Sequence, residues 1–129
     1  QFLEATAYRL GLSVPVAEVE PDDACEVFPR ALPVLPLPSG AKVIATPGAP
    51  DSANAGAIVE SITAAVDLVR SGAASAVVTN PIAKFVLTRV GFAHPGHTEF
   101  LAALAAREGR EPPLPVMIAF LLGALRSGG

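Results

Sequence analysis

A mostly apolar run at residues 74–78, followed closely by Pro81, constrains the fold of this chain more than any other feature. The run predicts a buried strand, and proline suits the first turn of a helix, so the pattern indicates a strand that leads into a helix at 81–89. Thr79 and Asn80 should then emerge at the carboxyl end of the strand. Open α/β sheets bind their ligands at that end.

Helical and strand patterns alternate along the rest of the chain. Helical patterns occur at 1–10, 22–28, 98–108 and in a long segment that begins with a cap at Asp51 or Ser52 and ends at Gly72. Gly109 is predicted to be the left-handed cap of the last helix. Further strands are predicted at 42–46 and 116–122, whereas prolines make 32–37 an edge strand or an extended connector. The alternation predicts an α/β fold with a parallel or mixed sheet flanked by helices.

Composition excludes several classes of protein. A length of 129 residues is typical of a single domain. With 51% hydrophobic and 16% charged residues, the chain can bury a core and is not expected to be disordered. A formal charge of −3 with only two lysines argues against a nucleic-acid surface. The longest apolar run, 116–122, is far shorter than the roughly 20 residues of a membrane helix. No leader pattern precedes the first helix, so we expect a cytoplasmic protein.

The only cysteine, Cys25, cannot form an internal disulfide, and we expect it to be buried or half-buried, as free cysteines usually are. The sequence also lacks several common nucleotide-binding and catalytic motifs. The sequence has no G-x-G-x-x-G after a strand, no P-loop and no G-x-S-x-G elbow. The residues alone therefore identify no catalytic group and no cofactor ligand.

Polar residues at the starts of two predicted helices form the candidate site. At Gly96 a loop turns into a helix, so free backbone N–H groups and the helix dipole favour a phosphate or carboxylate there. Lys84, in the first turn of the preceding helix, can add a positive charge. We expect the start of the later helix to lie beside the end of the strand at 74–78, which would make a pocket for an anionic metabolite.

Several interpretations of these residues stay open. His97 and Thr98 are either ligand contacts or a loop residue and a helix cap, and Lys84 is either a phosphate ligand or a solvated lysine. Thr79 and Asn80 either bind a ligand or hold the turn. A zinc site at His94 and His97 is rejected, because two histidines and a nearby carboxylate do not supply three or four supported ligands. Glu99 is interpreted as a first-turn carboxylate that stabilises the helix dipole.

Two strings in this region resemble a known family. Asn80-Pro81-Ile82 with Lys84, and Gly96-His97-Thr98-Glu99-Phe100-Leu101, resemble the central segment of the 4-hydroxythreonine-4-phosphate dehydrogenases of pyridoxal phosphate biosynthesis. Fainter similarity covers residues 1 to about 116. The resemblance implies that 1–129 is a single partial α/β domain of a longer, two-domain isocitrate/isopropylmalate dehydrogenase-like fold. Residues 117–129 depart from the family as a divergent or truncated tail, and Ala83 stands where many members have histidine.

The resemblance also implies an activity. The intact enzyme would oxidise 4-phosphooxy-L-threonine with NAD or NADP to a β-keto acid, which decarboxylates to 3-amino-2-oxopropyl phosphate. It would require zinc, magnesium or cobalt, with ligands outside this chain, and would act as a homodimer, so we expect the isolated chain to be inactive. The family's substrate-binding histidine and threonine fall on His97 and Thr98, and Lys84 and Asn80 are further substrate-binding candidates. Alternatives are a dehydrogenase of phosphorylated threonate or erythronate, and a non-catalytic α/β module that binds a phosphorylated metabolite or a protein partner.

Overall fold

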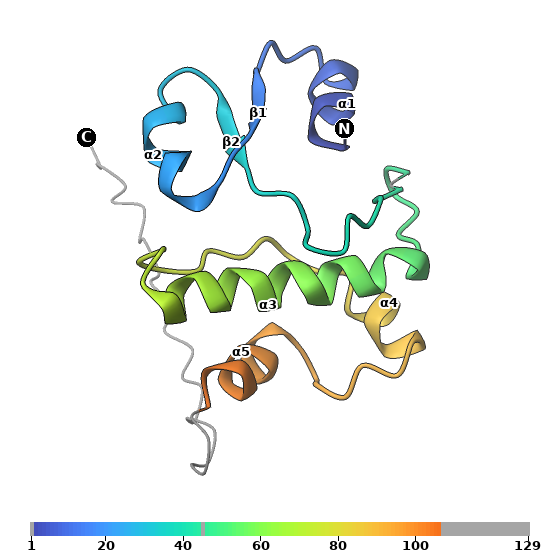
Figure 1. The fold of residues 1–129 in the computed structure, drawn as a ribbon. Coiled ribbons are helices and arrows are strands. Elements are labelled where there is room, and N and C mark those ends of the chain that lie inside the picture. The colour runs from blue at the N-terminus through green and yellow to red at the C-terminus, as the bar shows by residue number, and fades with distance from the viewer. Residues whose placement is uncertain (1, 45, 107–129) are drawn as a thin grey trace, which may run out of the picture.

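The computed structural model describes residues 2–44 and 46–106, which form helices and one small parallel sheet (Figure 1). The elements in chain order are α1 (Phe2–Arg9), β1 (Val16–Glu18), the 3-10 helix η1 (Pro21–Asp23), α2 (Ala24–Val27), β2 (Leu32–Val34), the 3-10 helix η2 (Ser52–Asn54), α3 (Ala55–Ser71), α4 (Lys84–Arg89) and α5 (His97–Ala105). The predicted α/β class with a parallel sheet flanked by helices is confirmed. No helix among these residues is long and apolar enough to span a bilayer.

The sheet consists of β1 and β2, which pair in parallel with Val16 opposite Leu32. The connection between them runs through η1 and α2, because parallel neighbours need a crossover rather than a hairpin. Pro33 lacks a backbone donor, which an edge strand tolerates, so the edge prediction for 32–37 is confirmed over β2. β1 was not predicted, since three residues are too few to show a period.

The long helix α3 begins and ends as its sequence predicts. The carboxylate of Asp51 accepts a hydrogen bond from the backbone N–H of Ala53 at 2.9 Å, which satisfies a donor that the helix start leaves free. At the other end Gly72 has a φ of 83° and is the left-handed cap. In Figure 1, α4 and α5 lie on one side of α3, and the small sheet with α1 and α2 lies on the other.

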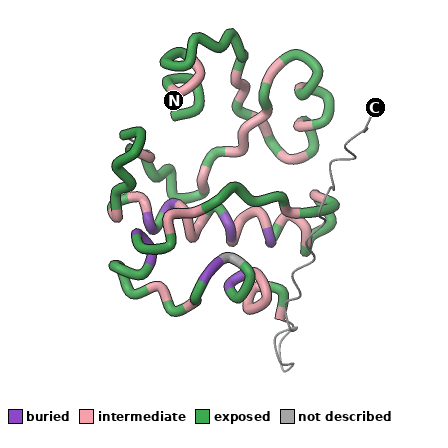
Figure 2. Tube along the Cα trace, turned by 180° about the vertical axis from the view of Figure 1, so that it is seen from behind, coloured by how far each residue is buried: buried purple, intermediate pink, exposed green. Residues whose placement is uncertain are grey.

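The buried hydrophobic residues of the described part of the chain lie on α3, α4 and α5 and leave the small sheet without a core of its own (Figure 2). Leu87 and Val86 of α4 are 1% and 2% exposed and pack with Ala55 at the start of α3. Phe92 packs against the same cluster from the connection after α4. This cluster fixes α4 against α3 and therefore determines where Lys84, the first residue of α4, is placed.

Two strand predictions are wrong. Residues 74–78 lie in an irregular segment between α3 and α4, and Val78 is 96% exposed. Residues 42–44 are also irregular, and Thr46 forms only an isolated bridge with Ala49. A strand requires a neighbouring strand to accept and donate its backbone hydrogen bonds. In the described part of the chain, β1 and β2 pair only with each other, so an apolar run alone could not become a strand.

Three smaller predictions also need correction or fall outside the described residues. The helix expected from Pro81 begins at Lys84, because Ala83 has a ψ of 87°, which is not helical. The helix expected to continue to residue 108 has its last described helical residue at Ala105, and Gly109 and the strand predicted at 116–122 lie outside the described residues. Cys25 is exposed rather than buried, because it lies on the short helix α2, which has no buried residue.

Candidate functional site

The side chain of Lys84 lies against the backbone of Gly96, where α5 begins. A Cβ built on Gly96 would lie 3.2 Å from both Cε and Nζ of Lys84, and 3.4 Å from Oε2 of Glu99. Gly96 is buried, whereas Lys84 and Glu99 are exposed. The structure therefore brings the ammonium group at the start of α4 to the first turn of α5, as a shared anion site requires.

Within the described residues, no side-chain hydrogen bond caps the first turn of α5. Gly96 is the N-cap residue and provides no side-chain hydrogen bond, while its carbonyl accepts the first helical bond from the N–H of Phe100 at 3.2 Å. The interpretation of Thr98 as the helix cap is wrong, because the helix begins one residue earlier, at His97. Uncapped N–H groups and the positive end of the dipole together favour an anion at this place.

An aromatic cluster holds this first turn in place. The rings of Phe92 and Phe100 meet edge to face with centroids 5.0 Å apart, and the ring of His94 lies 5.3 Å from Phe92 and 5.1 Å from Phe100. Phe100 is 8% exposed, so it anchors α5 in the core. His94 is therefore a packing residue. Among the described residues no group of three or more His, Cys, Asp or Glu side chains could hold a metal ion.

The other end of α5 is tied to α3. Nη1 of Arg70, in the last turn of α3, donates a hydrogen bond to the carbonyl of Leu104 at 3.2 Å. A cation near the last carbonyls of a helix stabilises its negative end. The orientation of α5 is thus set at both ends, by the aromatic cluster and by Arg70, and its first turn is held beside Lys84.

The charges at the site are not neutralised by direct pairing. Within residues 2–44 and 46–106 the ammonium of Lys84 forms no ion pair, although the carboxylate of Glu99 approaches the same Cβ position of Gly96. Glu99 in the first turn stabilises the α5 dipole, as the sequence indicates. A bound anion would accept hydrogen bonds from the ammonium of Lys84 and from the free N–H groups at the start of α5. Glu99 and Gly96 were not predicted as neighbours of Lys84, because only the fold brings the first residue of α4 to the start of α5.

The other predicted site residues are less closely placed. Thr79 and Asn80 are exposed and form no hydrogen bond with another described residue, so no hydrogen bond between described residues joins Asn80 to the start of α5. The strand end that we expected beside α5 is absent, and Lys84 is the group that lies there. The backbone of His97 begins α5, but its side chain lies outside what the structure describes.

A pocket of about 290 Å³ lies beside this region. It is lined by Val43, Thr46, Ala49, Pro50, Asp51, Asn54, Ile58, Ala83 and Val86. Asn54 holds one wall of the pocket. Its Oδ1 accepts a hydrogen bond from the backbone N–H of Ile44, and its Nδ2 donates one to the carbonyl of Ile44. Ala83 therefore faces a largely apolar pocket, and the histidine that the resembling family often has at this position is replaced here by a small apolar side chain.

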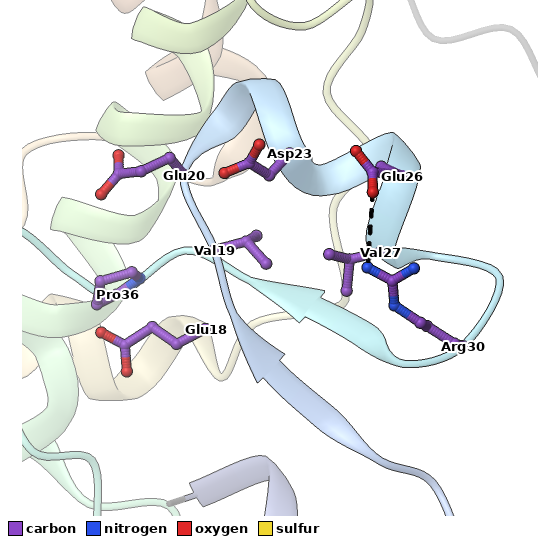
Figure 3. Close-up of a pocket in the computed structure, with 8 residues that line it drawn as sticks. All are labelled: Glu18, Val19, Glu20, Asp23, Glu26, Val27, Arg30 and Pro36. Atoms are coloured by element: carbon purple, nitrogen blue, oxygen red, sulfur yellow. Dashed lines mark ion pairs between the residues drawn. The ribbon is translucent and has the colours of Figure 1, made fainter.

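A larger pocket of about 580 Å³ lies between the small sheet and α2 (Figure 3). It is lined by Glu18, Val19, Glu20, Asp23, Glu26, Val27, Arg30 and Pro36, and contains none of the residues predicted from the sequence. Its only cation, Arg30, lies 3.8 Å from the carboxylate of Glu26. The remaining carboxylates would repel a phosphate, so among the described residues Lys84 and the start of α5 are the better candidates for an anion site.

Comparison with known proteins shows which sequences this chain resembles. The sequence profile of the family described as pyridoxal phosphate biosynthetic protein PdxA matches residues 1–121. A 4-hydroxythreonine-4-phosphate dehydrogenase of Methylorubrum extorquens (strain PA1) is 98% identical over 118 residues, covering 92% of this chain and 34% of the relative. One of Xanthobacter autotrophicus (strain ATCC BAA-1158 / Py2) is 53% identical over 116 residues, covering 90% and 33%. The chain thus spans about a third of the length of these relatives. No solved structure matches it.

Proposed function

This chain belongs to the PdxA family of pyridoxal phosphate biosynthetic proteins, and from that premise we propose that the whole protein is a 4-hydroxythreonine-4-phosphate dehydrogenase. In the proposed reaction the secondary hydroxyl of 4-phosphooxy-L-threonine loses a hydride to NAD or NADP and a proton to solvent. The resulting β-keto acid releases carbon dioxide and becomes 3-amino-2-oxopropyl phosphate. The described residues would form one wall of the substrate site in this enzyme.

The observation that carries the proposal is the position of the Lys84 ammonium against Gly96, at the uncapped start of α5. A point charge beside free backbone donors suits a phosphate or a carboxylate. We assign the anionic end of the substrate to Lys84 and to the backbone amides of His97 and Thr98. The side chains of His97 and Thr98 would contact the substrate directly, and Asn80 is a further candidate contact.

The metal and the cofactor are assigned to other parts of the protein. The described residues do not offer three or more metal-binding side chains in one place, so they do not fit a zinc, magnesium or cobalt ion. We derive no chemical step through a metal, and we assign neither its ligands nor the NAD or NADP site to these residues. The proposal includes a two-domain isocitrate/isopropylmalate dehydrogenase-like fold, of which this chain is one partial α/β domain, and a homodimer.

The activity can be tested by following the formation of reduced NAD or NADP with 4-phosphooxy-L-threonine. A full-length relative is expected to turn over, to lose activity with a chelator and to regain it with a divalent metal, while the 129-residue chain is expected to be inactive. No turnover by the full-length relative would contradict the proposed reaction. Robust turnover by the chain alone would show that the metal and cofactor sites were assigned to the wrong segments.

The same assay distinguishes related substrates. In this proposal Lys84 and the α5 amides contact only the anionic group of the substrate. Phosphorylated threonate and erythronate would therefore also fit this part of the site. We expect the largest kcat/KM for 4-phosphooxy-L-threonine. A larger value for either of the other two would reassign the substrate and leave the anion site unchanged.

A further inference from the structure

We infer that Gly96 is a positioning residue for Lys84, because its missing side chain leaves the space in which the ammonium lies at the start of α5. The inference rests on the proposed function, in which Lys84 binds the anionic end of the substrate. Gly96 itself would not contact the reacting atoms. Its contribution would be the position of a charge on a neighbouring helix.

The backbone of Gly96 does not itself require glycine. Its φ of −177° and ψ of −168° describe an extended conformation that any residue adopts. This differs from Gly72, whose φ of 83° favours glycine whatever surrounds it. The reason for glycine at position 96 must therefore be sought in the space around it.

The atoms around Gly96 belong to the proposed site. An added Cβ would lie 3.2 Å from Cε and from Nζ of Lys84, and 3.4 Å from Oε2 of Glu99. A contact of 3.2 Å is tighter than most real Cβ contacts, so the neighbour must give way by a few tenths of an ångström, and the end of a lysine side chain is easily moved. A methyl group at position 96 would therefore push the ammonium away from the start of α5 while leaving the backbone in place.

Displacing the ammonium should weaken substrate binding more than turnover. We expect Gly96→Ala to raise KM for 4-phosphooxy-L-threonine roughly 10-fold with little change in kcat, because a charge-assisted contact to the anion is lost. Gly56→Ala is the matched control. Gly56 is on α3, and a Cβ there would meet nothing within 4 Å, so KM should not change.

A double-mutant cycle in a full-length relative that has the same residues tests whether Gly96 acts through Lys84. Lys84→Ala should raise KM by at least as much as Gly96→Ala. In the Lys84→Ala background, Gly96→Ala should add less than about 2-fold, since the side chain it displaces is already gone. If Gly96→Ala does not fold, recovery of folding by Lys84→Ala in the same chain supports the inference, and no recovery overturns it.

The outcomes separate this inference from the proposed function. If the effects of the two substitutions on KM multiply, Gly96 does not position Lys84 and the proposed function stands. The same holds if Lys84→Ala raises KM and Gly96→Ala does not. If Lys84→Ala leaves KM unchanged, the substrate role proposed for Lys84 is wrong, and the inference about Gly96 fails with it.

Discussion

His97→Ala is expected to lower kcat/KM for 4-phosphooxy-L-threonine roughly 10- to 100-fold in a full-length relative. The expectation follows from assigning a substrate contact to His97, since a hydrogen bond to a charged group contributes about 1.5–3 kcal/mol. Steady-state kinetics with the phosphorylated substrate measure the effect. Thr98→Ala should change kcat/KM in the same direction, because Thr98 is exposed in the first turn of α5.

The matched control is His94→Ala, which removes the only other histidine. His94 packs with Phe92 and Phe100, so its loss should cost about 0.5–1.5 kcal/mol for each aromatic contact and leave kcat/KM nearly unchanged. Equal losses of kcat/KM for the two variants would mean that the effect comes from the loop structure and not from a substrate contact at His97.

Leu87→Ala is expected to lower the free energy of unfolding of the 129-residue chain by about 2–5 kcal/mol. Leu87 is 1% exposed and packs in the cluster that joins α4 to α3, so truncating it leaves a cavity. Urea unfolding followed by circular dichroism measures the change. Lys84 is on the same helix, and the variant should therefore also bind the substrate less well in a full-length relative.

Leu10→Ala makes the same chemical change where the side chain is 64% exposed. It should alter the free energy of unfolding by only about 0.5 kcal/mol, since most of that surface already faces water. If both variants lost the same amount, the cluster around Leu87 would not be the core that holds α4 in place.

The helices were the most predictable part of the fold. Asp51 and Gly72 mark the ends of α3 through local chemistry, a side-chain cap and a left-handed residue, which the sequence displays directly. The strand predicted at 74–78 was wrong for the opposite reason. Its apolar residues indicate burial, but strand formation depends on a partner elsewhere in the chain, and no local pattern shows whether that partner is present.

The candidate site was predictable in its parts but not in its assembly. The glycine-led start of α5 and the charge of Lys84 could both be recognised in the sequence, and the structure places them in contact. The contact depends on the packing of α4 and of the aromatic cluster at Phe92 and Phe100. The neighbouring sequence suggests that Asn80 belongs to the same site, but no hydrogen bond between described residues joins it to α5.

The account depends most on Lys84 and the α5 amides binding the phosphate end of the substrate. The direct test is the ratio of dissociation constants for 4-hydroxy-L-threonine and 4-phosphooxy-L-threonine, measured by calorimetry on a full-length relative and its variants. Lys84→Ala should reduce the preference for the phosphorylated compound roughly 10-fold, while replacing the only other lysine, Lys42→Ala, should leave it unchanged. An undiminished preference in Lys84→Ala would contradict the account.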